Sequence, residues 1–391
     1  MMEKKKEVWK ILLIIGGFIS YNVGAGFASG NEILQFYACW DKKGVILSLI
    51  CGCLLTIWFC AVIFWLGQIS AKMEINNIFQ WATGKIPGKI FRLITDIMII
   101  GCFMLMFSGA GNVLQQQFKI PLLSGAVILG IATVTVVLGG HKKIETVLGY
   151  AGIIILTYAA IFALYTLIGG KSSIENMALI PEAVSQGQIL RANILALFPF
   201  SIFPRLASFN SPVLEGILYS TQCIMAGFPF YFSLGRRCTS EKQAVCAGVL
   251  SGIAFYLCIT FVVVILIFNF DALINPETGS MFVFPALAAL NKLWTSGGWT
   301  YSLVIFTGIF SSAVGYLWVM NERVFPQEEG TKRSKILIAS LTLTGVLVGN
   351  KIPFSELINF LFPMTGAVGF IMLLLCTWKL IQILREKSIS K

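Results

Sequence analysis

The sequence predicts an all-α membrane protein with about ten transmembrane helices in two inverted five-helix repeats, the first and sixth helices being discontinuous. Three observations predict this: long apolar segments, glycines in the middle of the first segment, and weak similarity between the two halves. Of 391 residues, 57% are hydrophobic and 12% are charged, about half the charged fraction of a soluble domain. Because apolar stretches of about 18 residues or more recur, we expect an integral membrane protein in contact with the lipid bilayer.

Ten candidate spans follow from the hydropathy pattern. They cover residues 9–38, 44–68, 90–114, 121–139, 146–168, 212–234, 243–268, 299–324, 335–349 and 354–379. With the N-terminus inside, 21 of the 29 basic residues fall on the inner side and 8 on the outer side. Since Lys and Arg accumulate in cytoplasmic loops, both termini are predicted to be cytoplasmic in a bacterial cell membrane. The net charge of +11 therefore implies no nucleic-acid partner.

The first span contains the stretch Ser20-Tyr-Asn-Val-Gly-Ala-Gly-Phe-Ala-Ser-Gly30. Glycine destabilises a helix by roughly 1 kcal/mol relative to alanine. In a bilayer, open backbone is tolerated only where it lines a cavity or is buried in protein. The stretch therefore predicts a helix broken at mid-depth, whose free N–H groups can hold an anion and whose free carbonyls can hold a cation. The residues expected at this substrate site are Tyr21, Asn22, Gly24, Ala25 and Gly26.

A simpler interpretation of the glycines is close helix packing. Gly26 and Gly30 have the small-xxx-small spacing that often marks contact between membrane helices. Gly24 and Gly26, however, are two residues apart and cannot share one packing face. We therefore favour the broken helix.

Two short motifs recur about 200 residues apart. Tyr21-Asn-Val-Gly-Ala-Gly-Phe27 is similar to Tyr219-Ser-Thr-Gln-Cys-Ile-Met-Ala-Gly-Phe228, and Phe107-Ser-Gly-Ala-Gly111 is similar to Phe310-Ser-Ser-Ala-Val-Gly315. An odd number of spans in each half predicts that the second half is inverted, with binding near the midplane. The predicted division is a first repeat over residues 1–169, an extracellular connection over 170–211 and a second repeat over 212–391.

A second long outer connection joins spans seven and eight. Loops of this length are uncommon unless they are functional. This one, from Asn269 to Gly298, carries an amphipathic segment at Phe282–Trp294. We expect a short helix there that covers an outer vestibule.

Span six carries four consecutive polar residues, Tyr219-Ser-Thr-Gln222, followed by Gly227 and Pro229. Gly227 and Pro229 can both loosen the helix. The alternative is that the hydroxyls bond back to carbonyls one turn earlier and have no other role. Four consecutive side chains cannot all face one neighbour, so we favour a substrate role for some of them. The candidates are Tyr219, Ser220 and Thr221.

Span eight carries the hydroxyl pair Ser311 and Ser312. Two hydroxyl oxygens, completed by carbonyls of the opened first span, could bind a small hard cation. Oxygen ligands without a carboxylate suit a monovalent ion better than a divalent one. The alternative, in which the two hydroxyls only hold neighbouring helices together, is equally compatible with the sequence.

Glu32 follows the glycine stretch in the outer half of span one. An apolar environment favours the neutral form of a carboxyl group, which makes Glu32 a candidate proton carrier. The alternative is an ion pair with an outer cation such as Arg205 or Lys43. Asp96, by contrast, lies one turn after Arg92 in span three, where a local ion pair is expected.

No catalytic pattern is evident in the sequence. The chain has one histidine, His141, and it falls in a predicted inner loop next to Lys142 and Lys143. Neither a His-Glu-x-x-His zinc motif nor a Ser/His pair at membrane depth is possible. We therefore expect no enzyme and no cofactor.

The chain resembles the amino acid–polyamine–organocation (APC) superfamily of LeuT-fold secondary transporters, and within it the YkvI-like membrane proteins. The resemblance rests on Gly24-Ala-Gly-Phe-Ala-Ser-Gly-Asn-Glu32, on Tyr219 and on Phe310-Ser-Ser-Ala-Val-Gly315. The ten-span plan extends it to nearly the whole chain. It implies uptake of a small-molecule substrate, an amino acid or similar small zwitterion, coupled to sodium by alternating access.

The resemblance also implies roles for individual residues. The N–H groups of Ala25 and Gly26 would bind a substrate carboxylate, while span six around Tyr219 and span three around Phe107 and Ser108 would shape the side-chain pocket. The implied sodium ligands are the carbonyls of Ser20, Val23 and Gly308 and the hydroxyls of Ser311 and Ser312.

The chain departs from the family pattern at three places. Phe27 replaces the Asn that serves a second sodium in neurotransmitter-type relatives, which weighs against that site. Phe107 or Ser108 stands near the expected carboxylate-binding Tyr, which weighs against amino-acid specificity. No Lys occurs between Ile153 and Thr166, where some proton-coupled relatives have one, and this favours sodium.

Two other functions remain compatible with these features. One is a sensor of the same fold, such as a germinant-type receptor subunit that binds an amino acid without transporting it. The other is a proton-coupled carrier that uses Glu32.

Overall fold

The structure, a computed structural model, describes residues 2–73, 75, 77–169, 172–189, 211–294, 297–326, 330–351 and 354–389. Each predicted span has a helical counterpart. The first consists of α1 (Met2–Asn22), α2 (Ala25–Ser29), α3 (Asn31–Ile33) and the π-helix η1 (Leu34–Ala38). The others are α4 (Lys42–Ile69), α6 (Lys85–Phe118), α7 (Leu122–Val137), α8 (His141–Ile168), α11 (Pro212–Arg236), α12 (Glu241–Phe268), α14 (Gly297–Val324), α15 (Lys332–Val348) and α16 (Phe354–Ile389).

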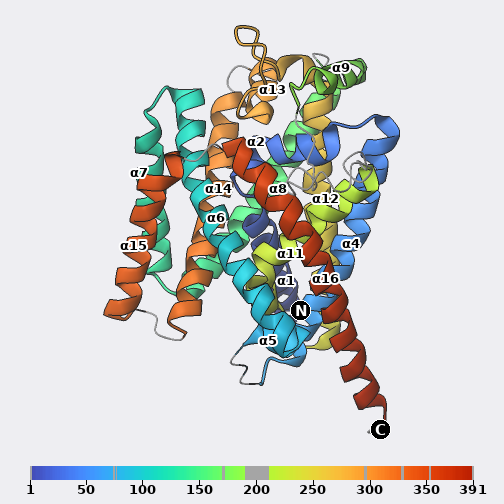
Figure 1. Cartoon of the computed structure of the whole chain (residues 1–391), viewed down its shortest axis with the longest axis vertical. Helices are drawn as coiled ribbons and strands as arrows, with labels where there is room; N and C mark the ends of the chain where they lie inside the picture. Colours follow the sequence, from blue (N-terminus) through green and yellow to red (C-terminus); the bar gives the residue numbers. More distant parts are fainter. Residues whose placement is uncertain are drawn as a thin grey trace, which may run out of the picture.

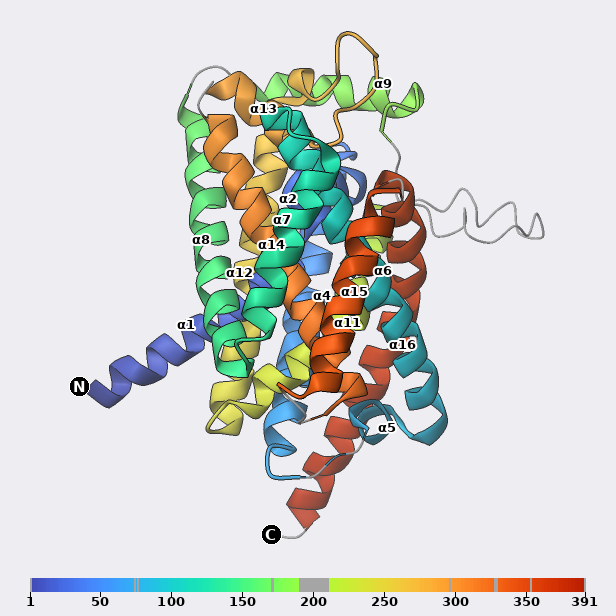
Figure 2. The same cartoon turned by 90° about the vertical axis from the view of Figure 1, so that its left-hand side faces the viewer.

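The long helices run roughly alongside one another, and short helices cover one end of the bundle (Figures 1 and 2). These are η2 (Ile174–Leu179), α9 (Ile180–Ser185), η4 (Phe270–Ala272) and α13 (Pro285–Leu293), while α5 (Ile78–Thr83) lies at the opposite end and η5 (Gly349–Lys351) precedes α16. The short helix expected in the second long connection is thus confirmed as α13. Of the connection predicted at 170–211, the described residues 172–189 form η2, α9 and short turns.

Six helices in the described part of the chain are long and apolar enough to cross a membrane. They are Lys42–Ile69, Lys85–Phe118, Thr146–Ile168, Glu241–Phe268, Gly297–Val324 and Thr365–Ile389. Large apolar side chains such as Leu54, Ile131 and Leu303 lie exposed on the outside of the bundle. Such side chains are more stable in contact with lipid hydrocarbon than with water. The chain is an integral membrane protein.

The sixth span differs from its prediction, because α11 is continuous from Pro212 to Arg236. The Ser220 hydroxyl donates to the Gly216 carbonyl at 2.9 Å, so this polar side chain bonds back along the helix without opening it. Near Pro229, the Tyr21 hydroxyl donates to the Ala226 carbonyl at 2.9 Å. Because Pro229 has no N–H group, it weakens this turn of the helix. The hydrogen bond from Tyr21 gives the Ala226 carbonyl in the same turn a donor. The expected discontinuity of helix six is therefore wrong.

Glycines let two pairs of helices meet backbone to backbone. A Cβ atom at Gly16 of α1 would collide with the Gly149 carbonyl of α8, and one at Gly216 of α11 would collide with the Ser48 carbonyl of α4. Small residues permit such close approach in membrane helices. Close packing therefore does explain some glycines of this chain, although not those at the middle of span one.

Gly16→Ala is expected to destabilise the protein by about 1–3 kcal/mol, because the new methyl group has only backbone to displace. The neighbouring Gly17→Ala is a matched control, since its Cβ would make an ordinary contact 3.8 Å from the Leu234 side chain. Thermal unfolding in detergent checks the pair. Equal melting temperatures for the two variants would contradict the close α1–α8 contact.

Candidate functional site

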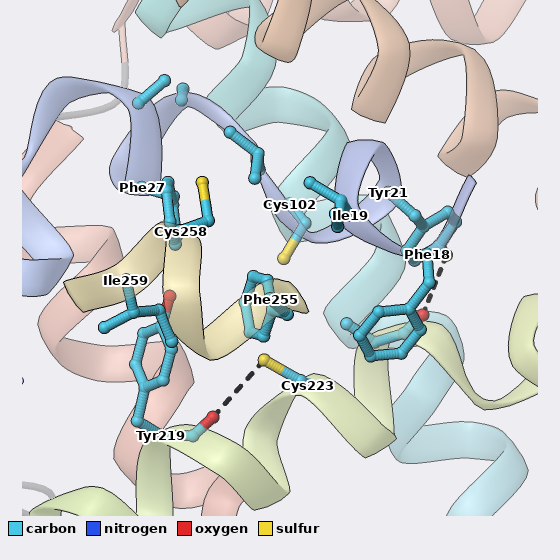
Figure 3. Close-up of a cluster of buried hydrophobic side chains, with 14 of the residues drawn as sticks. Phe18, Ile19, Tyr21, Phe27, Cys102, Tyr219, Cys223, Phe255, Cys258 and Ile259 are labelled. Carbon is cyan, nitrogen blue, oxygen red and sulfur yellow. Dashed lines mark hydrogen bonds between the residues drawn. The ribbon is translucent and has the colours of Figure 1, made fainter. Parts of the chain in front are cut away.

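The first span is interrupted halfway along, as predicted. Helix α1 ends at Asn22, Val23 and Gly24 are not helical, and α2 begins at Ala25. Gly24 has an extended backbone with φ −81° and ψ −166°. A second interruption follows at Gly30, whose φ of +83° lies in the left-handed region that favours glycine. Figure 3 shows Tyr21 and Phe27 on either side of the first interruption, hereafter the break (Val23–Gly24).

The break frees the carbonyl of Ser20. In a continuous helix this oxygen would accept from the N–H of Gly24, but that N–H donates to the Asn22 carbonyl at 2.9 Å. Two hydroxyls of α14 replace the missing donor: Ser311 and Ser312 donate to the Ser20 carbonyl at 3.1 Å and 2.9 Å. The interrupted backbone and the predicted hydroxyl pair are therefore in direct contact.

The remaining predicted sodium residues lie at the same place. The Ser312 hydroxyl is also 3.2 Å from the Tyr21 carbonyl. A Cβ at Gly308 would lie 2.8 Å from the Val23 carbonyl oxygen, so the absence of a side chain there lets α14 approach the break. We call the residues Ser20, Val23, Gly308, Ser311 and Ser312 the oxygen cluster.

The chemistry of the oxygen cluster fits a small monovalent cation. Its members are neutral carbonyl and hydroxyl oxygens, and a hydroxyl can rotate to present a lone pair to a cation instead of donating its proton. The carbonyl end of α1 adds the negative end of a helix dipole. Among the described residues, no group of three or more His, Cys, Asp or Glu could hold a metal ion.

Tyr21 and Asn22 tie the end of α1 to α11. Tyr21 bonds to the Ala226 carbonyl and stacks on Phe230 with ring centroids 4.5 Å apart. The Asn22 side chain accepts a 2.6 Å hydrogen bond from the Tyr231 hydroxyl. Both are predicted substrate residues that lie at the break, and both hold it in place.

The other predicted substrate residues separate into two groups. Tyr219 reaches Glu32, whereas Ser220 and Thr221 point elsewhere: the Ser220 hydroxyl meets the Tyr256 hydroxyl at 2.6 Å and the Thr221 hydroxyl donates to the Gly366 carbonyl at 2.6 Å. These two side chains face α12 and α16. The structure thus places them in helix contacts away from the break.

Span three also faces the break with different residues from those predicted. The Phe107 ring packs against Gly345 of α15, and the Ser108 hydroxyl lies 3.4 Å from the Asn112 amide nitrogen. The residues of α6 nearest the break are Met106, whose Cε would lie 2.9 Å from a Cβ at Gly24, and Gly109, against Ala25. Met106 and Gly109 have no polar side chain, so nothing in the sequence indicated that they lie at the break.

Glu32 lies over the first turn of α2. Its side chain is buried, and its Oε2 accepts from the Tyr219 hydroxyl at 3.2 Å. The Phe27 backbone N–H hydrogen-bonds the same carboxylate. A Cβ at Gly26 would collide with it. The carboxylate thus lies at the first turn of α2, beside Gly26 and on the N–H of Phe27, next to the Ala25 and Gly26 N–H groups that were expected to meet a substrate.

No family model matches the chain. It is similar to the membrane protein YkvI of Bacillus subtilis (strain 168), with 23% identity over 368 residues covering 92% of this chain and 93% of YkvI. It is also similar to YyaD of the same organism, with 24% identity over 366 residues covering 93% and 94%.

Among solved structures, MhsT in complex with L-phenylalanine gives a TM-score of 0.62 at 17% identity, covering 92% of this chain and 87% of MhsT. A substrate-bound Na+-coupled sialic acid symporter gives 0.60 at 11% identity, covering 95% and 78%. A manganese transporter of Eremococcus coleocola gives 0.52 at 14% identity, covering 94% and 76%. The chain has the LeuT fold. These solved neighbours are transporters rather than enzymes.

The LeuT-fold chain also has a cavity of about 490 Å³ between α11 and α14, on the side of α5. Pro229, Trp318 and Arg323 are among the residues that line it. Arg323 pairs with Asp96 and lies over the Phe79 ring, 4.9 Å from its centroid. The expected local pair between Arg92 and Asp96 is present at 4.0 Å. Charged side chains thus join α14 to α6 at this end of the bundle.

Proposed function

We propose that the chain is a secondary active transporter that takes up a small amine-bearing solute, such as an amino acid or similar small zwitterion, together with sodium. The observation that carries this proposal is the oxygen cluster. The hydroxyls of Ser311 and Ser312 meet the Ser20 carbonyl that the break leaves without its helical donor. Two structural neighbours, a Na+-coupled sialic acid symporter and MhsT with bound L-phenylalanine, support the same class of cargo and ion.

Alternating access gives this site a mechanical role. We propose that α1, α4, α11 and α12 rock against a scaffold of α6, α7, α14 and α15. The oxygen cluster joins α1 of the first group to α14 of the second. A cation bound there would strengthen that junction, and its release would weaken it. The equilibrium between the two arrangements would then depend on the ion, since a ligand shifts such an equilibrium only by its differential affinity.

A proton-coupled carrier is the second candidate, and one observation favours it. Among the described residues, no Lys or Arg forms an ion pair with the buried carboxylate of Glu32. A buried carboxylate without a basic partner tends to take up a proton. Protonation and release at Glu32 would then drive the same rocking motion.

Reconstitution into liposomes tests the proposal. We expect counterflow of a radiolabelled amine or amino acid, and accumulation driven by an inward sodium gradient but not by a potassium gradient. Accumulation that follows only a proton gradient would favour the second candidate. Ligand binding without counterflow would contradict both and indicate a receptor.

A further inference from the structure

The first turn of α2, where a substrate carboxylate was expected, already holds a carboxylate of the protein, that of Glu32. The Gly30 turn, with φ +83°, directs the chain so that Glu32 reaches back to the first turn of α2. There it hydrogen-bonds the Phe27 N–H and the Tyr219 hydroxyl. Gly26 leaves the space for this contact, because any side chain at that residue would collide with the carboxylate.

Among the described residues, no positively charged side chain interacts with Glu32; Arg205, one of the two cations expected as its partner, lies outside them. The described titratable groups that interact with Glu32 are Cys102 of α6, Tyr219 and Cys223 of α11, and Tyr316 of α14, none of which can become a cation. A buried carboxylate is costly unless it is paired. A bound cation would remove that cost, whereas a substrate carboxylate at the same turn would add a like charge.

Tyr219, which bonds Glu32, is one of several packed aromatic residues of the first span, α11 and α12. Tyr219 packs against Phe36 with ring centroids 5.2 Å apart, and Phe27 packs against Phe255 at 5.6 Å. Figure 3 shows Phe27 on the first span, with Tyr219 of α11 and Phe255 of α12 facing it. Aromatic faces attract organic cations. The Met106 thioether end, which lies against Gly24, is flexible and can move to admit a ligand.

We propose that the cargo is an organic amine without a carboxylate, whose ammonium group pairs with Glu32. The inference rests on the transporter function proposed above and narrows its amine-bearing solutes to those without a carboxylate, which excludes amino acids. Glu32 supplies from the protein the carboxylate that a zwitterionic substrate would bring with it. The oxygen cluster binds the inorganic cation separately, through carbonyls and hydroxyls.

Thermal stabilisation of the purified full chain by matched probes tests this proposal. One set is 2-phenylethylamine, phenylalanine and 3-phenylpropionate; a second is isopentylamine, leucine and 4-methylpentanoate. Each set differs only in the ammonium and carboxylate groups. We expect the amine to raise the melting temperature in a saturable way, and the amino acid and the acid to leave it unchanged.

Glu32→Gln is expected to weaken amine binding by about 30-fold or more, as loss of one partner of a buried charge pair does. Glu32→Asp keeps the charge on a shorter side chain and should bind at an intermediate level. Glu215→Gln removes another buried glutamate, at the start of α11, and is expected to leave amine binding unchanged. The melting temperature of each variant without ligand shows whether it is folded.

Several results would overturn the proposal. They are stronger stabilisation by the amino acid than by its amine, no stabilisation by any amine, and equal amine binding by wild type and Glu32→Gln. Loss of sodium binding by Glu32→Gln, with its preference among amines, amino acids and acids unchanged, would also overturn it. The cation paired with Glu32 would then be sodium. Counterflow without preference for amines would overturn this inference alone, whereas amine binding without counterflow would overturn only the transporter function.

Discussion

Ser312→Ala is expected to weaken the sodium stimulation of uptake strongly at ordinary sodium concentrations. The Ser312 hydroxyl lies 2.9 Å from the Ser20 carbonyl and 3.2 Å from the Tyr21 carbonyl, at the centre of the oxygen cluster. Loss of a polar contact to a charged group costs about 1.5–3 kcal/mol, which raises the half-saturating sodium concentration roughly 10- to 150-fold. Initial rates of uptake into liposomes at varied sodium concentrations measure this change.

Ser302→Ala is the matched control for Ser312→Ala. Ser302 is also buried in α14, but its hydroxyl donates to the Gly298 carbonyl of its own helix at 2.7 Å. Its removal costs a local hydrogen bond and touches no part of the oxygen cluster. A similar sodium dependence for Ser312→Ala and Ser302→Ala would show that the Ser311–Ser312 pair only holds helices together.

Gly26→Ala is expected to reduce uptake below about a tenth of the wild-type rate. Its methyl group would occupy the place of the Glu32 carboxylate, which would then lose the Phe27 N–H and the Tyr219 hydroxyl. Tyr219→Phe removes only one of these hydrogen bonds, at 3.2 Å. A single such bond contributes about 1 kcal/mol, so this variant should lose roughly fivefold in apparent affinity. Uptake and binding of the same labelled amine compare the two variants.

Gly17→Ala provides the control for an added methyl group on the same span. Gly17 lies in α1, away from the break, and its Cβ would make only ordinary contacts with Phe230 and Leu234. We expect it to fold and to transport as wild type does. Normal uptake by Gly26→Ala would mean that the position of Glu32 over α2 has no part in transport.

The parts of the site that could be predicted from sequence are those encoded by short local patterns. The glycine stretch interrupts its own helix, so the break at Val23–Gly24 follows from residues next to one another. The Gly308-x-x-Ser-Ser312 spacing puts a small residue and two hydroxyls on nearby turns of one helix. The structure brings both patterns into contact.

Which side chains of a helix point toward the break could not be predicted in the same way. A side chain's direction depends on the rotation of its helix, and one residue changes it by about 100°. Ser220 therefore turns to Tyr256 while its neighbour Tyr219 reaches Glu32. On α6, Met106 rather than Phe107 lies against Gly24. The apolar side chain of Met106 gave no signal of a role at the break.

The contact between Glu32 and Gly26 depends on tertiary geometry. The sequence predicted a glutamate in apolar surroundings beyond the break. The contact of the Glu32 side chain with the first turn of α2, however, follows from the left-handed backbone at Gly30. That turn is itself held by α13, because a Cβ at Gly30 would lie 2.9 Å from the Cβ of Ala286. A helix predicted as a cover over the outer vestibule thus also packs on the turn that positions Glu32.

Equilibrium binding of radioactive sodium to the purified protein is the most direct test of the central claim, that the broken first span and α14 together form a cation site. We predict saturable sodium binding by the wild type and by Ser302→Ala, and its loss in Ser312→Ala. Absence of saturable binding to the folded wild type, or equal binding by Ser312→Ala, would contradict the claim.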